Sequence, residues 1–129
     1  MGSTTNFTIG EIEHGGVHDH HAVLDPGSRF VVTAKDHKAK GYFWDYTVSG
    51  DNCDGQISRY HDKHTYPKGP FGTTLTKPGS TAMNFILSSK AQAGSICEIQ
   101  FLYKNGWEED SVTKMDTLVL KVGKPKIDF

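Results

Sequence analysis

The sequence lacks the features of membrane-spanning and nucleic-acid-binding proteins. No apolar run approaches the ~20 residues that a transmembrane helix needs. The 14 Lys and Arg side chains nearly balance the 15 Asp and Glu side chains, for a formal net charge of -1. A chain without a basic excess is poorly suited to a phosphate backbone or an anionic bilayer. We therefore expect a soluble protein that binds neither nucleic acid nor membrane.

Helical periodicity is absent as well. No segment repeats apolar residues at helical spacing over the ~11–18 residues that such a prediction needs. Instead, short segments alternate apolar and polar residues, with turn signals roughly every eight to twelve residues. At 129 residues the chain is long enough for one hydrophobic core but not for two. The sequence thus predicts one domain over residues 1–129, an all-β, immunoglobulin-like sandwich of about seven to eight strands. The expected strands lie within residues 7–9, 17–24, 29–34, 40–48, 57–60, 82–87, 96–103 and 118–122.

The most aromatic strand is expected at residues 40–48. One face carries Tyr42, Trp44, Tyr46 and Val48, and the other carries Phe43, Asp45 and Thr47. Rings at a period of two suit a pleated, largely buried surface. We therefore predict a central strand with Trp44 in the core, preceded by a basic loop at residues 37–40.

Three further loops are expected. Residues 66–72 hold two prolines and two glycines, which oppose both helix and strand pairing. Residues 77–81 form the next loop. Residues 104–106 read as a hairpin turn with Trp107 at its far side. An exposed indole there is either an anchor for a partner, which we favour, or the lid of a small hydrophobic cluster.

The sequence holds only two cysteines, Cys53 and Cys97. They form either one disulfide, which would add ~2–4 kcal/mol of stability, or two buried free thiols. A disulfide would imply an oxidising, secreted or vesicular compartment, and free thiols a cytoplasmic one. The first five residues lack the pattern of a secretory signal, so localisation stays open.

Histidines are the densest chemical cluster, at His14, His18, His20 and His21. On a strand, His18 and His20 share a face and make a candidate metal pair. The alternative is a solvated edge strand, which we favour because no Cys or Glu at a zinc spacing completes the site. Likewise, His61 and His64 with Asp62 could act in catalysis only with a cysteine nucleophile, and neither cysteine has a nucleophile motif. We predict no enzyme and no cofactor.

The order of these elements resembles the chagasin-like inhibitors of papain-family cysteine peptidases. In that family a turn glycine opens a strand that leads to the loop N-P-T-T-G, an aromatic residue, a spacer and a tryptophan. Here Gly27 and the sequence Gly41-Tyr42-Phe43-Trp44 follow the same spacing. A glycine-containing loop at 77–81 and a Tyr103-to-Trp107 segment stand where the family has its second loop and its R-P-W loop. The chain keeps Gly41 of the first motif and Trp107 of the third.

The resemblance implies a monomeric immunoglobulin-like sandwich that reversibly inhibits or binds papain-like cysteine peptidases. Three loops at one end of the sandwich would enter the active-site cleft. The partner-binding residues that it implies are His37, Lys38, Ala39, Lys40, Gly41, Lys77, Pro78, Gly79, Ser80, Thr81, Lys104, Asn105, Gly106 and Trp107. The alternatives are an immunoglobulin-like adhesion or carrier module with another protein partner, and a metal-binding protein that uses the histidine cluster.

Overall fold

The alternating segments form β-strands that build two four-stranded sheets and one small hairpin. The computed structural model describes residues 4–9, 18–37, 41–66, 68–69, 72–73, 79–107 and 112–124, with backbone alone at 18–20, 68–69, 72–73 and 113–115. The strands are β1 (Thr4–Ile9), β2 (His18–Leu24), β3 (Arg29–Asp36), β4 (Tyr42–Ser49), β5 (Ile57–Thr65), β6 (Lys68–Gly69), β7 (Gly72–Thr73), β8 (Gly79–Leu87), β9 (Ile96–Asn105) and β10 (Val112–Val122). Within these ranges no helix is long and apolar enough to cross a membrane.

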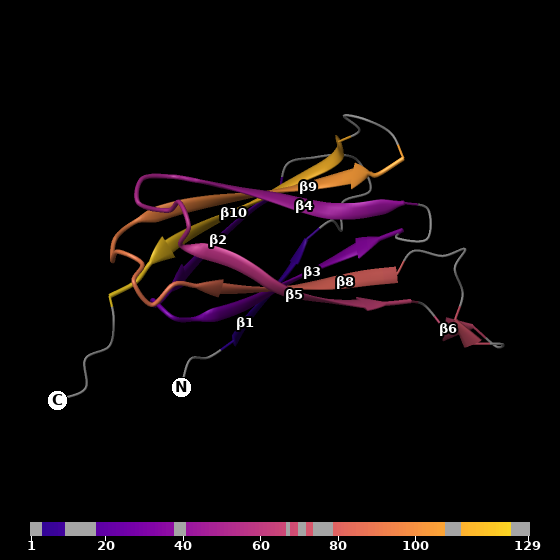
Figure 1. Cartoon of the computed structure of the whole chain (residues 1–129), viewed down its shortest axis with the longest axis horizontal. Helices are drawn as coiled ribbons and strands as arrows, with labels where there is room; N and C mark the ends of the chain where they lie inside the picture. The colour runs from indigo at the N-terminus through magenta and orange to yellow at the C-terminus, as the bar shows by residue number, and fades with distance from the viewer. Residues whose placement is uncertain are drawn as a thin grey trace.

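The two larger sheets lie face to face (Figure 1). The first sheet has the order β1-β3-β8-β5 and the second has the order β2-β10-β9-β4. Pairing is antiparallel except at β1 with β3 and at β2 with β10, which are parallel. The prediction of an all-β, immunoglobulin-like sandwich is confirmed.

The core forms where the inward faces of the two sheets meet. Phe30 of β3 stacks on Phe85 of β8 with ring centroids 5.1 Å apart, and Phe85 meets Phe101 of β9 edge-on at 5.9 Å. All three rings are fully buried, and burying each contributes roughly 1.5–3 kcal/mol. These rings join the first sheet to the second.

The aromatic strand β4 is an edge strand, so the prediction of a central strand was wrong. β4 pairs only with β9, at the end of the second sheet. The facial assignment was right: Trp44 is 2% exposed and Phe43 on the other face is 40% exposed. Alternation reports which face is buried but not how many neighbours a strand has.

Two loop boundaries also differ from the prediction. Within residues 66–72, expected to be all loop, the backbone at 68–69 pairs with 72–73 in a short hairpin. Strand β8 begins at Gly79, so Gly79, Ser80 and Thr81 pair with neighbouring strands instead of forming a loop tip. β5 continues to Thr65, beyond the expected residues 57–60. β8 pairs with β3 on one side and with β5 on the other, and this pairing continues to the start of the strand at Gly79 and Ser80.

A disulfide joins Cys53, in the turns after β4, to Cys97 near the start of β9. The two Cα atoms lie 5.7 Å apart, and both side chains are buried. Of the two alternatives, the structure has the paired form.

The strand ends that flank the predicted loops gather at one end of the sandwich. β3, β5 and β9 end there, and β4, β8 and β10 begin there, on the right of Figure 1. This end is called the loop end below. Cys97 lies near the opposite end of β9, so the disulfide is far from the loop end.

Candidate functional site at the loop end

The structure describes nine of the fourteen predicted binding residues, and all nine lie at or beneath the loop end. They are His37, Gly41, Gly79, Ser80, Thr81, Lys104, Asn105, Gly106 and Trp107. The predictions at Lys38, Ala39, Lys40, Lys77 and Pro78 lie outside the described residues.

The first and third loops touch each other through Gly41 and Trp107. Gly41 has φ +85°, in the left-handed region, and its carbonyl accepts a 2.8 Å hydrogen bond from the Gly106 amide. A β-carbon added to Gly41 would lie 2.8 Å from Cδ2 and Cε2 of Trp107. The indole therefore rests against bare backbone, which only glycine provides.

Trp107 is the most exposed large apolar side chain in the described part of the chain, at 74%. Its backbone amide donates to Asn105 Oδ1 at 2.9 Å, which closes the turn after β9. Because so much of the ring is open to solvent, it is not the lid of a cluster. The indole is an exposed apolar projection at the loop end.

The start of the first loop is anchored on β9. The His37 amide donates to the Tyr103 hydroxyl at 2.8 Å across 66 residues of sequence, and the Tyr42 amide donates to the His37 carbonyl at 3.3 Å. The Tyr103 ring lies between those of Tyr42 and Trp44, with centroids 5.0 and 4.9 Å away. Burial raises the pKa of the Tyr103 phenol, which keeps this group neutral below alkaline pH.

A buried polar cluster of Asp36, Thr81 and His64 lies beneath the first and second loops. The Thr81 hydroxyl donates to Asp36 Oδ2 at 2.5 Å, and His64 Nδ1 lies 2.8 Å from Thr81 Oγ1 and 3.3 Å from Asp36 Oδ1. Since the single hydroxyl hydrogen goes to Asp36, Thr81 Oγ1 accepts from Nδ1, which therefore carries a hydrogen. The cluster ties β3, β5 and β8 together below the loops.

The prediction that Thr81 contacts a partner needs correction, because Thr81 is only 5% exposed. It supports the loop end from inside. No role was predicted for Asp36 from the sequence. His64 was considered for catalysis instead. One signal for Asp36 was available: it continues the inward positions Phe30, Val32 and Ala34 at a period of two, so a buried carboxylate with partners was to be expected.

The second loop approaches β5 closely at Gly79. A β-carbon on Gly79 would lie 2.3 Å from the Thr65 carbonyl oxygen and 3.2 Å from His64 Nε2. Any larger residue would push β8 away from β5. Gly79 therefore sets the spacing between β8 and β5 at this end of the sheet.

Lys104 is engaged on the outer face of the second sheet. Its ammonium lies 2.9 Å from Asp45 Oδ2. Partial burial acts to raise the pKa of Asp45, but the Lys104 hydrogen bond, with the Tyr46 amide and the positive charges of Lys104 and Arg59, holds this pKa below its usual range. The Lys104 and Asp45 side chains are 34% and 45% exposed, so solvent screens the ion pair and its net contribution to stability is small.

The other chemistry that the sequence suggested is not assembled in the described part of the chain. His14 lies outside it, His18 and His20 are described as backbone only on β2, and His21 is exposed. Within the described ranges, no group of three or more metal-capable side chains occurs. Both cysteines are in the disulfide, and Arg59 binds Asp62 through two hydrogen bonds, which leaves neither a thiol nucleophile nor a free orienting acid.

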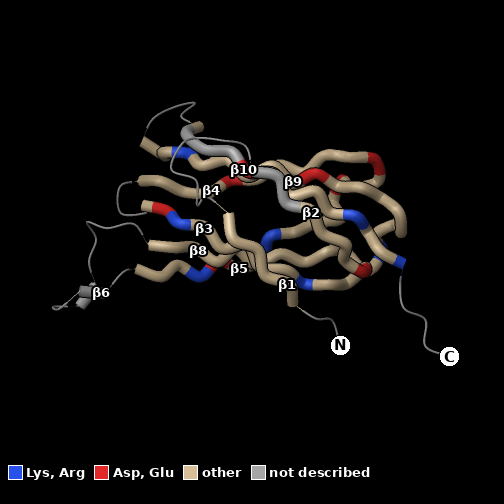
Figure 2. Tube along the Cα trace, turned by 180° about the vertical axis from the view of Figure 1, so that it is seen from behind, with Lys and Arg blue, Asp and Glu red and all other residues tan. Residues whose placement is uncertain are grey.

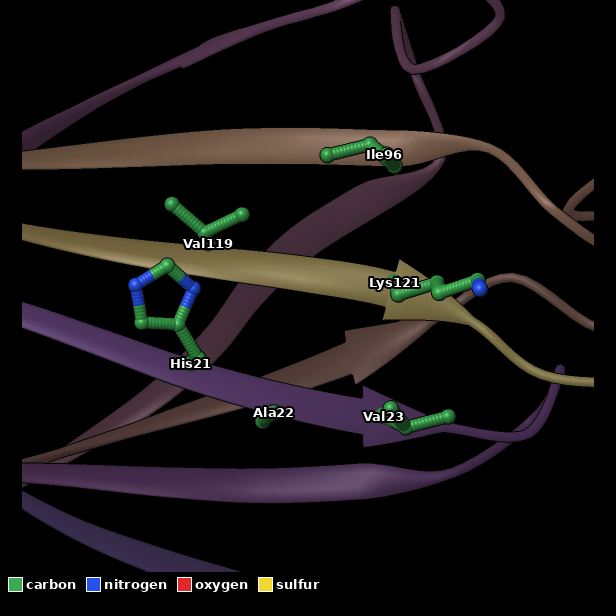
Figure 3. Close-up of a pocket in the computed structure, with 6 residues that line it drawn as sticks. All are labelled: His21, Ala22, Val23, Ile96, Val119 and Lys121. Atoms are coloured by element: carbon green, nitrogen blue, oxygen red, sulfur yellow. The ribbon is translucent and has the colours of Figure 1, made fainter.

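A shallow, mainly aliphatic depression of about 370 Å³ lies on the outer face of the second sheet (Figure 3). Its lining residues are His21, Ala22, Val23, Ile96, Val119 and Lys121. Ile96 begins β9 and Asn105 ends it, so the depression is remote from the loop end and does not contribute to the site.

No protein-family model matches the chain, and no curated protein matches it. Solved structures do match its fold. The cysteine protease inhibitor EhICP2 from Entamoeba histolytica superposes with a TM-score of 0.64 at 14% identity, covering 92% of this chain and 96% of that one. PbICP-C, in complex with falcipain-2, superposes with a TM-score of 0.55 at 15% identity, covering 94% of this chain and 99% of that one. Amebosin superposes with a TM-score of 0.54 at 16% identity, covering 96% of this chain and 100% of that one.

Proposed function

We propose that the chain is a chagasin-like protein that reversibly inhibits papain-like cysteine peptidases with its loop end, without chemistry of its own. The observation that carries this proposal is Trp107, which projects from the loop end on a glycine support. The chain shares its fold with a cysteine protease inhibitor and with a protein solved in complex with falcipain-2. This likeness supports a cysteine peptidase as the partner.

The affinity comes mainly from apolar contact and loop backbone. Positions of positive and negative residues are interspersed along the described part of the chain (Figure 2), so the proposal does not rest on a face of one charge. Tryptophan is among the residues enriched at interface hot spots, where truncation typically costs ≥ 2 kcal/mol. Lys38 and Lys40 act by steering the protein toward an acidic surface of the peptidase.

The remaining predicted residues position this anchor. Gly41, Asn105 and Gly106 hold Trp107 in place, and Gly79 and Ser80 present the second loop. The protein acts as a monomer. The Cys53–Cys97 disulfide favours an oxidising, secreted or vesicular compartment.

The test is inhibition of papain and of a cathepsin-L-like enzyme by the wild type and by Trp107→Ala. The matched control is Ile96→Ala, since Ile96 is 58% exposed at the opposite end of β9. We expect reversible inhibition that weakens about 30-fold or more in Trp107→Ala, as a 2 kcal/mol hot spot implies, and that is unchanged in Ile96→Ala. No inhibition and no complex at micromolar concentrations would favour the adhesion or carrier alternative.

A further inference from the structure

The apolar surface at the loop end does not stop at Trp107. Phe43 of β4 and Val112 of β10 are 40% and 43% exposed. Both pair with Lys104 of β9, Phe43 from one side and Val112 from the other, so the three side chains form one row across the second sheet. Phe43 is near the start of β4 and Lys104 is near the end of β9. The row therefore lies on the outer face of the sheet, just below the loop end.

The row is continuous with Trp107. Gly106 bridges them: its amide bonds the Gly41 carbonyl beneath the indole, and a β-carbon on it would lie 3.5 Å from Phe43 Cε1. Gly106 therefore lies next to the Phe43 ring and is bonded to Gly41, on which the Trp107 ring rests. A partner that covers Trp107 meets Phe43 next.

Lys104 does not interrupt this surface with a free charge. Its ammonium bonds Asp45, two residues from Phe43 on the same face of β4. The methylene stem of a lysine held in this way adds apolar area. Among the described residues, the outer face of the second sheet near the loop end thus presents Phe43 and Val112 beside a lysine whose charge is already paired.

The other side of the loop end has a different character. Beneath it lies the polar cluster of Asp36, Thr81 and His64. Among the described residues there, Tyr66 is a ring at 36% exposure that packs edge-on against His64. An apolar partner surface would therefore bury more apolar area on the side of the second sheet.

Interface size also calls for more surface than the loops supply. The three predicted loops hold fourteen residues, of which Thr81 is buried. A specific, stable interface uses about 20–30 residues on each side. The contact must extend beyond the loops, and the adjoining apolar row is the surface in place to extend it.

We propose that Phe43, the Lys104 stem and Val112 form a second contact surface, the side platform, that packs on an apolar, uncharged rim beside the active-site cleft of the peptidase. This inference rests on the proposed function. The side platform would select among peptidases by the apolar character of that rim, while the loops occupy the cleft.

The test compares inhibition constants for exposed-residue variants in matched pairs. Phe43→Ala is paired with Tyr60→Ala, an exposed aromatic on β5 of the other sheet, and Val112→Ala is paired with Val23→Ala, an exposed valine on β2. We expect roughly tenfold weaker inhibition for Phe43→Ala and about threefold for Val112→Ala, both smaller than the ~30-fold loss of a hot spot, and no change for the two controls. Thermal melts establish that all four variants fold.

The outcomes separate this inference from the proposed function. If Trp107→Ala weakens inhibition and Phe43→Ala behaves like Tyr60→Ala, the side platform is overturned and the loop-end function stands. If the wild type inhibits no papain-like peptidase, both are overturned. A loss in Phe43→Ala that exceeds its control supports the side platform.

Discussion

Replacing Gly41 with alanine tests whether the first loop holds the Trp107 anchor. Gly41 has φ +85°, and an L-residue in this left-handed region costs roughly 1–2 kcal/mol. The new β-carbon would also lie 2.8 Å from two indole carbons, closer than carbon atoms approach without repulsion. We expect the Trp107 ring to move away from the loop.

Gly94→Ala is the matched control. Gly94 has φ +86°, nearly the same as Gly41, but no atom lies within 4 Å of its added β-carbon. Both substitutions should lower the free energy of unfolding by roughly 1–2 kcal/mol. For a chain of 129 residues this corresponds to a fall in Tm of roughly 4–7 °C. The effect that Gly41→Ala shows in excess of Gly94→Ala reports the indole contact.

The binding effect of Gly41→Ala should be a fraction of the effect of removing Trp107. If truncating the anchor costs about 2 kcal/mol, or about 30-fold, displacing it should weaken inhibition roughly 5- to 30-fold. Gly94→Ala should inhibit like the wild type at 25 °C, because it changes stability alone.

Tryptophan fluorescence reads the displacement directly. Of the two tryptophans, Trp44 is 2% exposed and Trp107 is 74% exposed, so acrylamide quenching follows mainly Trp107. Quenching should change in Gly41→Ala and stay at the wild-type level in Gly94→Ala. Equal inhibition and equal quenching in the two variants would refute the contact between the first and third loops.

Three further predictions concern the stability of the sandwich. The Cys53→Ala/Cys97→Ala variant should lose about 4 kcal/mol of unfolding free energy in urea, from the closed loop of 44 residues, yet inhibit normally; weakened inhibition would contradict the separation of the disulfide from the site. Thr81→Val should lose about 1–3 kcal/mol by stripping the buried Asp36 of its hydroxyl partner, and Thr81→Ser should restore most of it; equal losses would contradict the hydrogen bond. Because the folded-state pKa of Tyr103 is raised, its contribution to stability is complete below about pH 10. It should be lost as the pH rises further through the folded-state pKa, and urea melts of Tyr103→Phe at pH 9–11 should lack this slope.

The sequence predicted what depends on local periodicity. Alternation located the eight strands of the two sheets and placed Trp44 in the core, because a half-buried strand repeats every two residues whatever its neighbours are. Alternation does not report strand order. β4 therefore read as central although it is an edge strand.

The loop end was less accessible from sequence because its contacts join distant residues. Gly41 and Trp107 meet only after β4 pairs with β9. The buried cluster draws Asp36, His64 and Thr81 from three different strands. The period of two marks Asp36 as inward-facing, but no local pattern identifies its partners on the other two strands.

The resemblance supplied the arrangement of loops that the residues alone did not. Spacing around Gly41 and the position of Trp107 pointed to the fold of cysteine protease inhibitors, which the solved structures share with this chain. It also placed Thr81 at a loop tip, where the longer β8 instead buries it.

The measurement that tests the central claim most directly is the dependence of papain inhibition on substrate concentration. If the loop end occupies the active-site cleft, inhibition is competitive: the apparent inhibition constant rises in proportion to substrate concentration above KM, and full activity returns on dilution. Inhibition that is independent of substrate concentration, or no inhibition at micromolar protein, would contradict the account.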